Sequence, residues 1–354
     1  MSYHYGNKFS LTIFGESHQK AVGAVIEGLP AGESYPEKDV LAELAKRAPG
    51  QPGTTSRMEK DQPEILCGLF NQRFTGSALS VCFPNQNTRS EDYPLMYRPS
   101  HSDYPAAVRY QGYNDFRGGG QFSGRLTLPL VFAGAIAQSL LSSCHIHIGT
   151  HLTQVGTLQY PRYSSFTKAA LSDEQIPEAI YDYLSSLNGD SVGAKIECAV
   201  LGLPCGIGEP WFDSMESRLS HLLFSVPGLK GVLFGDALDM PASRGSQMND
   251  CYVKEAGVLK TITNHNGGIL GGLSTGMPIV FETIFKPTPS IALKQSTYDP
   301  ILDRQADLVI KGRHDPCIGI RALPVVKACA AIVIYDLLLE KYGSYETMKE
   351  NLHE

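Results

Sequence analysis

Several expected strands in this sequence follow one another with no helix between them. Lys8–Phe14 and Ala21–Ile26 form one such pair, and Glu64–Phe70 and Ala78–Phe83 form another. Because parallel strands must be joined by a long crossover, usually a helix, this order disfavours a regular series of strand–helix–strand units. The order of elements favours an α+β fold. We find no internal repeat or linker composition, so we expect one large domain over residues 1–354.

The other expected elements alternate irregularly along the chain. Hydrophobic periodicity and flanking glycine or proline residues mark their limits. The sequence predicts helices at Pro36–Lys46, Leu126–Leu141, Glu178–Leu187, Met215–Phe224 and Pro324–Tyr342. It predicts further strands at His145–Val155, Val192–Leu203, Gly231–Phe234 and Pro278–Phe285.

The charge and apolar content exclude several classes of protein. The net charge is −6, so no global field attracts nucleic acid or an anionic membrane. The segment Met1–Lys8 is polar and lacks the apolar core of a signal peptide, and runs such as Leu126–Leu141 are too short or too interrupted to span a bilayer. The eight cysteines form no Cys-x-x-Cys motif, and we expect them to be reduced thiols. We expect a cytoplasmic protein.

The stretch Tyr97–Arg125 combines residue types that neither a core strand nor an ordinary exposed loop would need. It holds four arginines, one histidine, and three consecutive glycines at 118–120. Glycine-rich backbone can approach a ligand closely, and the following helix start would direct N–H groups at an anion. The stretch therefore predicts an anion-binding site. The alternative interpretation is a glycine hinge with solvated arginines.

Five polar clusters flanked by glycine or proline carry the candidate chemistry. They lie at Glu16–Gln19, at Arg47–Arg57, at Arg98–Arg125, at Asn264–Ser274 with Lys286–Ser290, and at Arg313–Asp315. Histidine titrates near neutrality, and arginine presents a planar fork to phosphate or carboxylate. The candidates for proton transfer are His18, His101, His314 and Asp315. The candidates for anion binding are Arg47, Arg98, Arg125, Arg313 and Lys286.

Three competing motifs are disfavoured. The chain has no Gly-Lys dipeptide, which excludes a Walker A loop. Gly272–Gly276 matches Gly-x-Ser-x-Gly, but a serine-hydrolase elbow needs a strand before it and a helix after it, whereas glycines precede it and a strand is expected next. Cys144–His147 with His151 could be read as a zinc cluster. Alternation puts Cys144 opposite the two histidines, so we interpret it as an ordinary strand and expect no metal site.

In order and wording, the clusters resemble the chorismate synthase family. Gly15-Glu16-Ser17-His18 with Gly28-Leu29-Pro30 is similar to the family's first signature. Arg98–His101 and Gly118–Arg125 are similar to the second, and Gly312–Cys317 with Arg321–Val326 to the third. Asn266–Gly272 and Lys286–Ser290 also fit. Five clusters in order across one chain form a far more specific signal than any one of them alone.

The resemblance implies a carbon–oxygen lyase acting on a phosphate ester. Members catalyse the last step of the shikimate pathway, in aromatic amino acid biosynthesis. An anti 1,4-elimination removes phosphate and a ring proton from 5-enolpyruvylshikimate 3-phosphate and gives chorismate. The reaction needs reduced FMN although it has no net redox change. The family folds as a β-α-β sandwich and forms a homotetramer.

The same resemblance implies roles for individual residues. His18 would protonate the departing phosphate, His101 would stabilise the anionic reduced flavin, and Asp315 would assist proton removal at flavin N5. Ser17 and Ser123 would hydrogen-bond within this catalytic network. The implied substrate ligands are Arg47, Arg98, Arg125 and Arg313. The implied flavin contacts are Gln121, Phe122, Ser123, Pro227, Gly228, Gly271, Lys286, Pro287, Thr288, Pro289, Ser290 and Arg313.

The chain departs from the commoner family pattern at four positions. These are Gln19, Ala48, Gln121 and Lys327, none of them a proposed proton donor or acceptor. Because the loop after Arg47 differs from the family pattern, the sequence does not decide whether a nicotinamide site exists near Arg47. We therefore consider NADPH only as a candidate external reductant.

No reductase domain is visible in the sequence, so we expect a separate flavin reductase or another source of reduced flavin. The alternative function is a flavin-dependent oxidoreductase acting on a phosphorylated anionic substrate. A non-catalytic phosphoanion-binding protein would have no use for the two loop histidines and Asp315.

Overall fold

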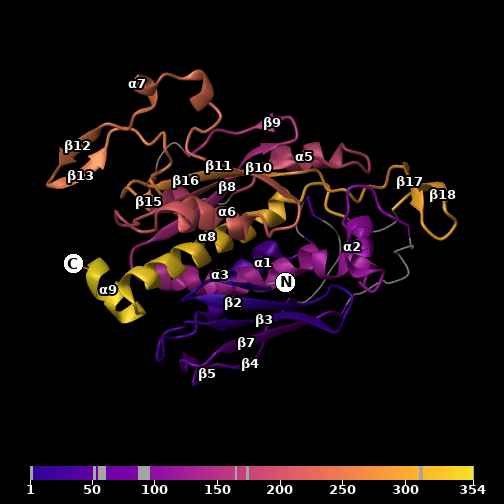
Figure 1. Cartoon of the computed structure of the whole chain (residues 1–354), viewed down its shortest axis with the longest axis horizontal. Helices are drawn as coiled ribbons and strands as arrows, with labels where there is room; N and C mark the ends of the chain where they lie inside the picture. Colours follow the sequence, from indigo (N-terminus) through magenta and orange to yellow (C-terminus); the bar gives the residue numbers. More distant parts are fainter. Residues whose placement is uncertain are drawn as a thin grey trace.

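The protein has three layers, with two antiparallel sheets enclosing a layer of helices (Figure 1). The computed structural model describes residues 3–50, 53–54, 61–86, 96–163, 166–172, 175–310 and 314–353. Helices and strands are mixed irregularly along the chain. This arrangement confirms the α+β class and the β-α-β sandwich.

The first sheet contains five strands in the order β1-β2-β3-β7-β4. Their bounds are His4–Tyr5 for β1, Ser10–Gly15 for β2, Ala21–Glu27 for β3, Leu79–Pro84 for β7 and Glu64–Cys67 for β4. In β7, buried residues alternate with half-buried ones, as expected for a strand with one face on the core. The strands β2 and β3 are neighbours in sequence and in space, as the sequence predicted.

The second sheet also contains five strands, in the order β11-β16-β10-β8-β9. Their bounds are Leu229–Phe234 for β11, Ile279–Phe285 for β16, Ala194–Leu201 for β10, His147–Val155 for β8 and Leu158–Gln159 for β9. Every neighbouring pair is antiparallel. The central strands β10 and β16 are almost wholly buried, so both faces of this sheet are largely covered.

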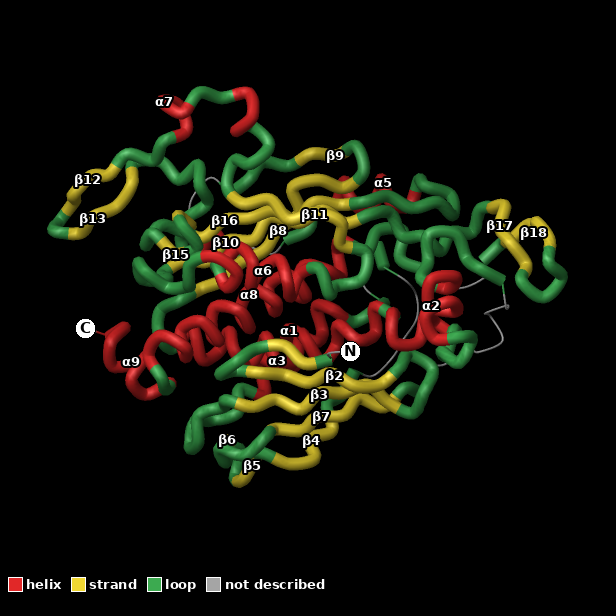
Figure 2. Tube along the Cα trace, viewed as in Figure 1, coloured by secondary structure: helices red, strands yellow, loops and turns green. Residues whose placement is uncertain are grey.

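Four helices fill the space between the sheets (Figure 2). They are α1 (Glu37–Arg47), α3 (Thr127–Ser142), α6 (Met215–Leu223) and α8 (Gly319–Tyr342). The helix α8 packs against α1, α3 and α6 and against strands β8 and β10. Because α3 and α8 are covered on nearly every side, their sequences are apolar all round rather than amphipathic.

Smaller elements lie around this core. The helices are α2 (Asp103–Tyr110), α4 (Lys168–Leu171), α5 (Glu178–Ser185), α7 (Gly245–Met248) and α9 (Tyr345–His353). Short 3-10 helices are η2 (Arg117–Phe122), η3 (Gly124–Leu126), η4 (Trp211–Asp213) and η5 (Met240–Ala242). Two-stranded hairpins are β5 (Leu69–Phe70) with β6 (Arg73–Phe74), β12 (Tyr252–Glu255) with β13 (Val258–Thr261), β14 (Ile269–Leu270) with β15 (Leu273–Ser274), and β17 (Gln295–Asp299) with β18 (Arg304–Leu308).

Most expected elements are shifted by one or two residues at an end, and three of the differences have a clear cause or consequence. The strand expected at Glu64–Phe70 is divided at Gly68, whose φ of +95° and close approach to Leu79 interrupt it. The strand expected from His145 begins at His147, because His145 adopts a left-handed conformation with φ of +60°. The helix expected from Pro324 begins at Gly319, so the proline lies inside α8.

In the part of the chain that the structure describes, two helical stretches have the length and apolar composition of a membrane span. They are Arg117–Ser142 and Gly319–Tyr342. By length and composition alone, these two stretches contradict the expectation that the apolar runs are too short or too interrupted to span a bilayer. Both stretches are mostly or wholly buried inside the protein, between the sheets. They are the core helices of the sandwich.

Candidate functional site

A cavity of about 1040 Å³ brings together segments from the whole length of the chain. Its walls include the loop after β2, the end of α1, the glycine turn before α3, the loop before β11 and the loop before α8. Most of the residues predicted from the sequence line it. They are Ser17, His18, Arg47, Arg98, His101, Gln121, Phe122, Ser123, Arg125, Pro227, Gly228, Lys286, Thr288, Pro289, Ser290, His314 and Asp315.

Three predicted residues are not brought to this cavity by the described part of the chain. Pro287 lies between lining residues but is not itself part of the wall. Gly271 lies in the tight turn between β14 and β15, where its φ of +62° suits glycine. Arg313 lies outside the described residues, so its predicted role stays a prediction.

The triple glycine, of which Gly118 and Gly119 line the cavity, has a conformation that other residues rarely adopt. Gly118, Gly119 and Gly120 all have positive φ, at 58°, 84° and 50°. A Cβ on Gly118 would lie 2.1 Å from His18 Cε1 and 2.7 Å from Ser17 Oγ. This glycine is therefore required because the side chains of two predicted catalytic residues rest against its backbone.

Ser17 fixes the orientation of the neighbouring histidine. Its hydroxyl lies 3.2 Å from the Arg117 carbonyl and 3.1 Å from the Gly118 carbonyl, which can only accept hydrogen bonds. The same oxygen lies 3.1 Å from His18 Nδ1. With its own proton directed at the carbonyls, Ser17 accepts from Nδ1–H. His18 therefore carries a proton on Nδ1, and in the neutral ring Nε2 carries the lone pair.

His101 is also held in one tautomer. Nδ1 donates to the Pro99 carbonyl at 3.0 Å, so the Ser290 hydroxyl, 2.8 Å from Nε2, donates to the ring. Burial, followed by the nearby charge of Arg98, lowers the pKa of His101 to about 4. The imidazole is thus neutral at pH 7, and an anion placed beside it would favour its protonated form.

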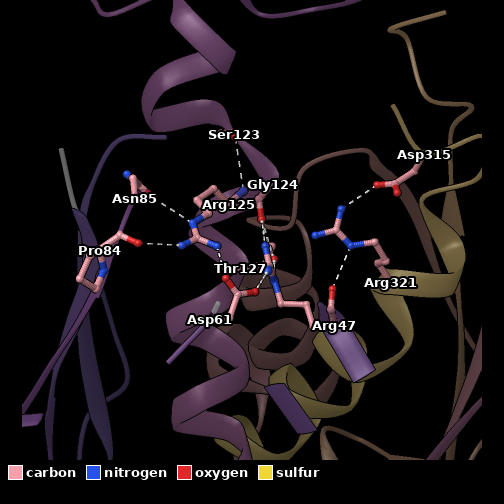
Figure 3. A network of polar contacts seen from close by, with 10 residues as sticks. All are labelled: Arg47, Asp61, Pro84, Asn85, Ser123, Gly124, Arg125, Thr127, Asp315 and Arg321. Carbon is pink, nitrogen blue, oxygen red and sulfur yellow. Dashed lines mark hydrogen bonds and ion pairs between the residues drawn. The ribbon is translucent and has the colours of Figure 1, made fainter. Parts of the chain in front are cut away.

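A row of buried arginines follows the other wall (Figure 3). Arg47 donates from Nε to Thr127 Oγ1 at 2.9 Å and from Nη2 to the Gly124 carbonyl at 2.9 Å. Arg125 donates from Nε to Asn85 Oδ1 at 3.0 Å. Both guanidiniums also form ion pairs with Asp61. Burial, and then the charge of Arg321, lower the pKa of Arg47, which means that its positive charge is held at an energetic cost.

Asp315 is tied to this row through Arg321. Arg321 Nη1 donates to Asp315 Oδ2 at 2.8 Å, and its Nε donates to the Arg47 carbonyl at 2.9 Å. Arg321 thereby gains the contact that the sequence did not assign. A carboxylate fixed beside a guanidinium is held in one rotamer, which suits a group that must face a defined atom.

Two further cations are anchored at the side of the cavity that holds His101. Arg98 forms a bidentate pair with Asp103 at 2.8 and 2.7 Å. Lys286 donates to the Ser100 carbonyl at 2.6 Å, and burial, then the charge of Lys230, lower its pKa. These contacts hold the positive charges of Arg98 and Lys286 close enough to act on His101.

The cavity as a whole is strongly cationic although the chain is acidic. Among the described lining residues, the Lys and Arg side chains are Arg47, Arg98, Arg125, Lys230, Lys286 and Arg321, against one carboxylate, Asp315. Asp61 and Asp103 neutralise part of this charge from behind. A local excess of positive charge in a concave site attracts a polyanion against the overall field.

Sequence reasoning missed two residues of the site. They are Asp61 and Lys230, which none of the five clusters includes. No pattern around Asp61 points to a buried carboxylate, because the residues it pairs with are distant in sequence. The signal for Lys230 was weak as well, since it lies at the start of an otherwise ordinary strand, β11.

The competing hydrolase motif forms a structural turn. Ser274 lies in the short strand β15 and is buried; its hydroxyl donates to the Pro204 carbonyl at 2.6 Å and accepts from Ile207 N–H at 2.8 Å. The segment lacks the strand–turn–helix arrangement of a nucleophile elbow, as the sequence predicted. The other competing motif, Cys144–His147 with His151, lies in and just before β8, where His151 Nε2 pairs with Glu197 Oε2 at 2.9 Å.

Comparison with known proteins agrees with the geometry. The family model described as chorismate synthase matches residues 9–339. The chorismate synthase of Thermococcus gammatolerans is 41% identical over 346 residues, covering 95% of this chain and 97% of the relative. That of Chitinophaga pinensis is 40% identical over 348 residues, covering 98% and 99%.

A solved structure shares the fold. A crystal structure of chorismate synthase superposes with a TM-score of 0.76 at 24% identity, covering 98% of this chain and 97% of that one. The family match over nearly the whole chain and the similarity of the two relatives lead to one conclusion. This chain belongs to the chorismate synthase family.

Proposed function

We propose that the cavity described above is where the chain carries out the elimination that defines its family. Chorismate synthases are lyases of the shikimate pathway that act on 5-enolpyruvylshikimate 3-phosphate and depend on flavin. The single observation that supports this placement is the gathering of His18, His101 and Asp315 into one cation-lined cavity. These three side chains come from loops that are far apart in sequence.

The charge of the cavity fits the substrate. A phosphate and two carboxylates make the substrate strongly anionic, and the described wall offers six cationic side chains around one carboxylate. Arg47 and Arg125 are our proposed ligands for the substrate's anionic groups, together with Arg98 and the undescribed Arg313. Guanidinium forks suit phosphate and carboxylate oxygens because they bind two oxygens at once.

The residues near His101 fit a reduced FMN. Thr288 Oγ1 is buried and has no hydrogen-bond partner among the described residues. Because buried polar groups are almost always hydrogen-bonded, this hydroxyl is a candidate for a hydrogen bond to a bound ligand. We propose that Gln121–Ser123, Pro227–Gly228 and Lys286–Ser290 hold the flavin, with Gly271 and Arg313 as further candidates. When bound, reduced FMN supplies the electron density that C–O bond cleavage needs.

His18 is our proposed general acid. Its Nδ1–H is held by Ser17, so the imidazolium form, with a proton on both ring nitrogens, would transfer its Nε2 proton to the departing phosphate. Phosphate leaves readily only when its growing charge is neutralised, and a positioned acid contributes typically ~10² to 10⁴-fold to such a step. Ser17 is proposed to support His18, and Ser123 to support Arg125, from whose N–H it accepts a hydrogen bond at 3.3 Å.

His101 and Asp315 complete the proposed proton chemistry. His101 is neutral in the free protein, and a flavin anion beside it would raise its pKa from about 4, so that binding and protonation are coupled. Asp315, oriented by Arg321, is proposed to assist removal of the ring proton at the flavin.

The assembly and the reductant belong to the same proposal. We propose a cytoplasmic homotetramer that receives reduced flavin from a separate reductase or another external source, with NADPH as the ultimate reductant. The resemblance to the family supports these assignments. Sizing of the purified protein tests the tetramer, and activity with FMN and NADPH but no added reductase tests the external source.

One experiment separates the lyase from a flavin-dependent oxidoreductase. Excess substrate is mixed anaerobically with enzyme and a sub-stoichiometric amount of photoreduced FMN. A lyase forms many chorismates for each flavin and leaves the flavin reduced. One product for each flavin, with oxidised FMN at the end, would identify an oxidoreductase, and an equal rate without flavin would contradict both.

A further inference from the structure

Asp61 lies between the two arginines that face the cavity (Figure 3). Its Oδ2 accepts from Arg47 Nη1 at 3.2 Å, and its Oδ1 accepts from Arg125 Nη1. Each carboxylate oxygen thus serves one guanidinium. The side chains of all three residues are less than a tenth exposed. The contact is a buried triad of two positive charges and one negative charge.

The remaining contacts of the arginines come from separate parts of the fold. Arg47 is held by Gly124 and Thr127 at the start of α3, whereas Arg125 is held by Asn85 just beyond β7. Among the described contacts, Asp61 is the acceptor that touches both guanidiniums. Its carboxylate therefore determines how close together the two forks lie.

The guanidiniums of Arg47 and Arg125 are both positively charged and contact the same carboxylate, so they repel each other strongly in this buried site. Burial and the charge of Arg321 already lower the pKa of Arg47, while Asp61 acts in the opposite direction. Removing one member of a buried ion pair leaves an uncompensated charge, which is far more costly than removing an exposed one. Without the carboxylate we expect the guanidiniums to move apart.

We infer that Asp61 is a positioning residue for the elimination, since it joins Arg47 and Arg125 into one rigid two-fork unit for the anionic substrate. The inference rests on the proposed role of these arginines as substrate ligands. Asp61 itself need not touch the substrate. Its carboxylate sets geometry rather than adding attraction, because its charge opposes the binding of an anion.

The test compares Asp61→Asn with the parent enzyme in two measurements. The kcat of phosphate release should fall by about 10- to 100-fold, because a displacement of about 1 Å in a positioning group has an effect of that order. The Kd of inorganic phosphate should stay the same or decrease, because the cavity gains a net positive charge. A kcat within about threefold of the parent would overturn the inference. So would a raised phosphate Kd that matches the loss of kcat, which indicates general disruption.

Two further variants keep the test decisive. Glu197→Gln removes another buried carboxylate that pairs with an arginine, Arg162, away from the cavity. It should lower stability and leave kcat unchanged. Should Asp61→Asn fail to fold, Asp61→Glu decides, since it keeps the charge but displaces it by one methylene. A folded Asp61→Glu enzyme with reduced kcat supports the inference, and one with the parent's kcat overturns it.

The arginine variants separate this inference from the proposed function. If Arg47→Ala and Arg125→Ala raise the substrate KM while Asp61→Asn turns over like the parent, only the inference about Asp61 is wrong. If both arginine variants keep the parent's KM, the arginines are not substrate ligands, and the proposed substrate clamp is wrong together with the inference.

Discussion

Replacing Gly118 by alanine should separate a backbone effect from a catalytic one. The new Cβ would lie 2.1 Å from His18 Cε1, where ordinary contact begins at 3.4 Å. The imidazole must therefore move by roughly 1 Å or more, and misplacement of that order lowers a rate by about 10²-fold. The left-handed conformation, with φ of +58°, adds a destabilisation of about 1–2 kcal/mol for any residue with a Cβ.

The chain offers a matched control one residue further on. Gly119 also has a positive φ, of +84°, but a Cβ there has no neighbour closer than 3.9 Å. Gly119→Ala should therefore show the backbone cost without displacement of His18. The assay is phosphate release under anaerobic conditions with reduced FMN, with urea unfolding as the measure of stability. Equal activity of the two variants would refute the reasoning, because only Gly118→Ala crowds the imidazole.

Three further perturbations test other parts of the site. His18→Ala should keep flavin binding and lose ~10² to 10⁴-fold in activity, and a loss of only about threefold would remove His18 from the acid role. Arg125→Ala should weaken substrate binding by roughly 1.5–3 kcal/mol and flavin binding by less, whereas titrations that show equal weakening would make the residue structural. Because the pKa of His101 is lowered to about 4, the unfolded chain binds more protons between about pH 6.5 and 4, so the flavin-free protein should lose stability as the pH falls through this window. In His101→Asn that part of the slope in urea unfolding should disappear, and an unchanged slope would contradict the assignment.

Much of the fold follows from the sequence because its long elements are strongly patterned. The apolar segment at Leu126–Leu141 became α3 with a shift of one residue at each end. The limits of α8 were less predictable. Proline is common at the first position of a helix, whereas Pro324 lies inside α8. The peripheral hairpins β12–β13 and β17–β18 were missed because they contribute little to the hydrophobic core.

The sequence predicted which residues belong to the site, but not which of them form hydrogen bonds and ion pairs with one another. The glycine, histidine and arginine clusters stand out locally, and the resemblance to a known family gave their roles. Partners such as Asp61 for Arg125 or Ser290 for His101 depend on tertiary packing between distant segments. Single-residue patterns contain no information about such contacts, so the neutral tautomer of His101 and the Asp61 triad emerged only from the structure.

The position of α8 near the end of the chain has a consequence for how the protein forms. This helix packs against α3 and against β8 and β10, so the apolar surfaces of both earlier segments stay uncovered until residues 319–342 have been synthesised. Contacts between distant parts of a chain make folding slow, and apolar surface left open during synthesis promotes aggregation. The helix α3 and the strands β8 and β10 therefore lack this partner while the residues between them and α8 are being synthesised. During refolding, the ability to bind flavin should arise only with the slowest kinetic phase, because the α8 residues Arg321, Ala322 and Val325 form part of the cavity wall.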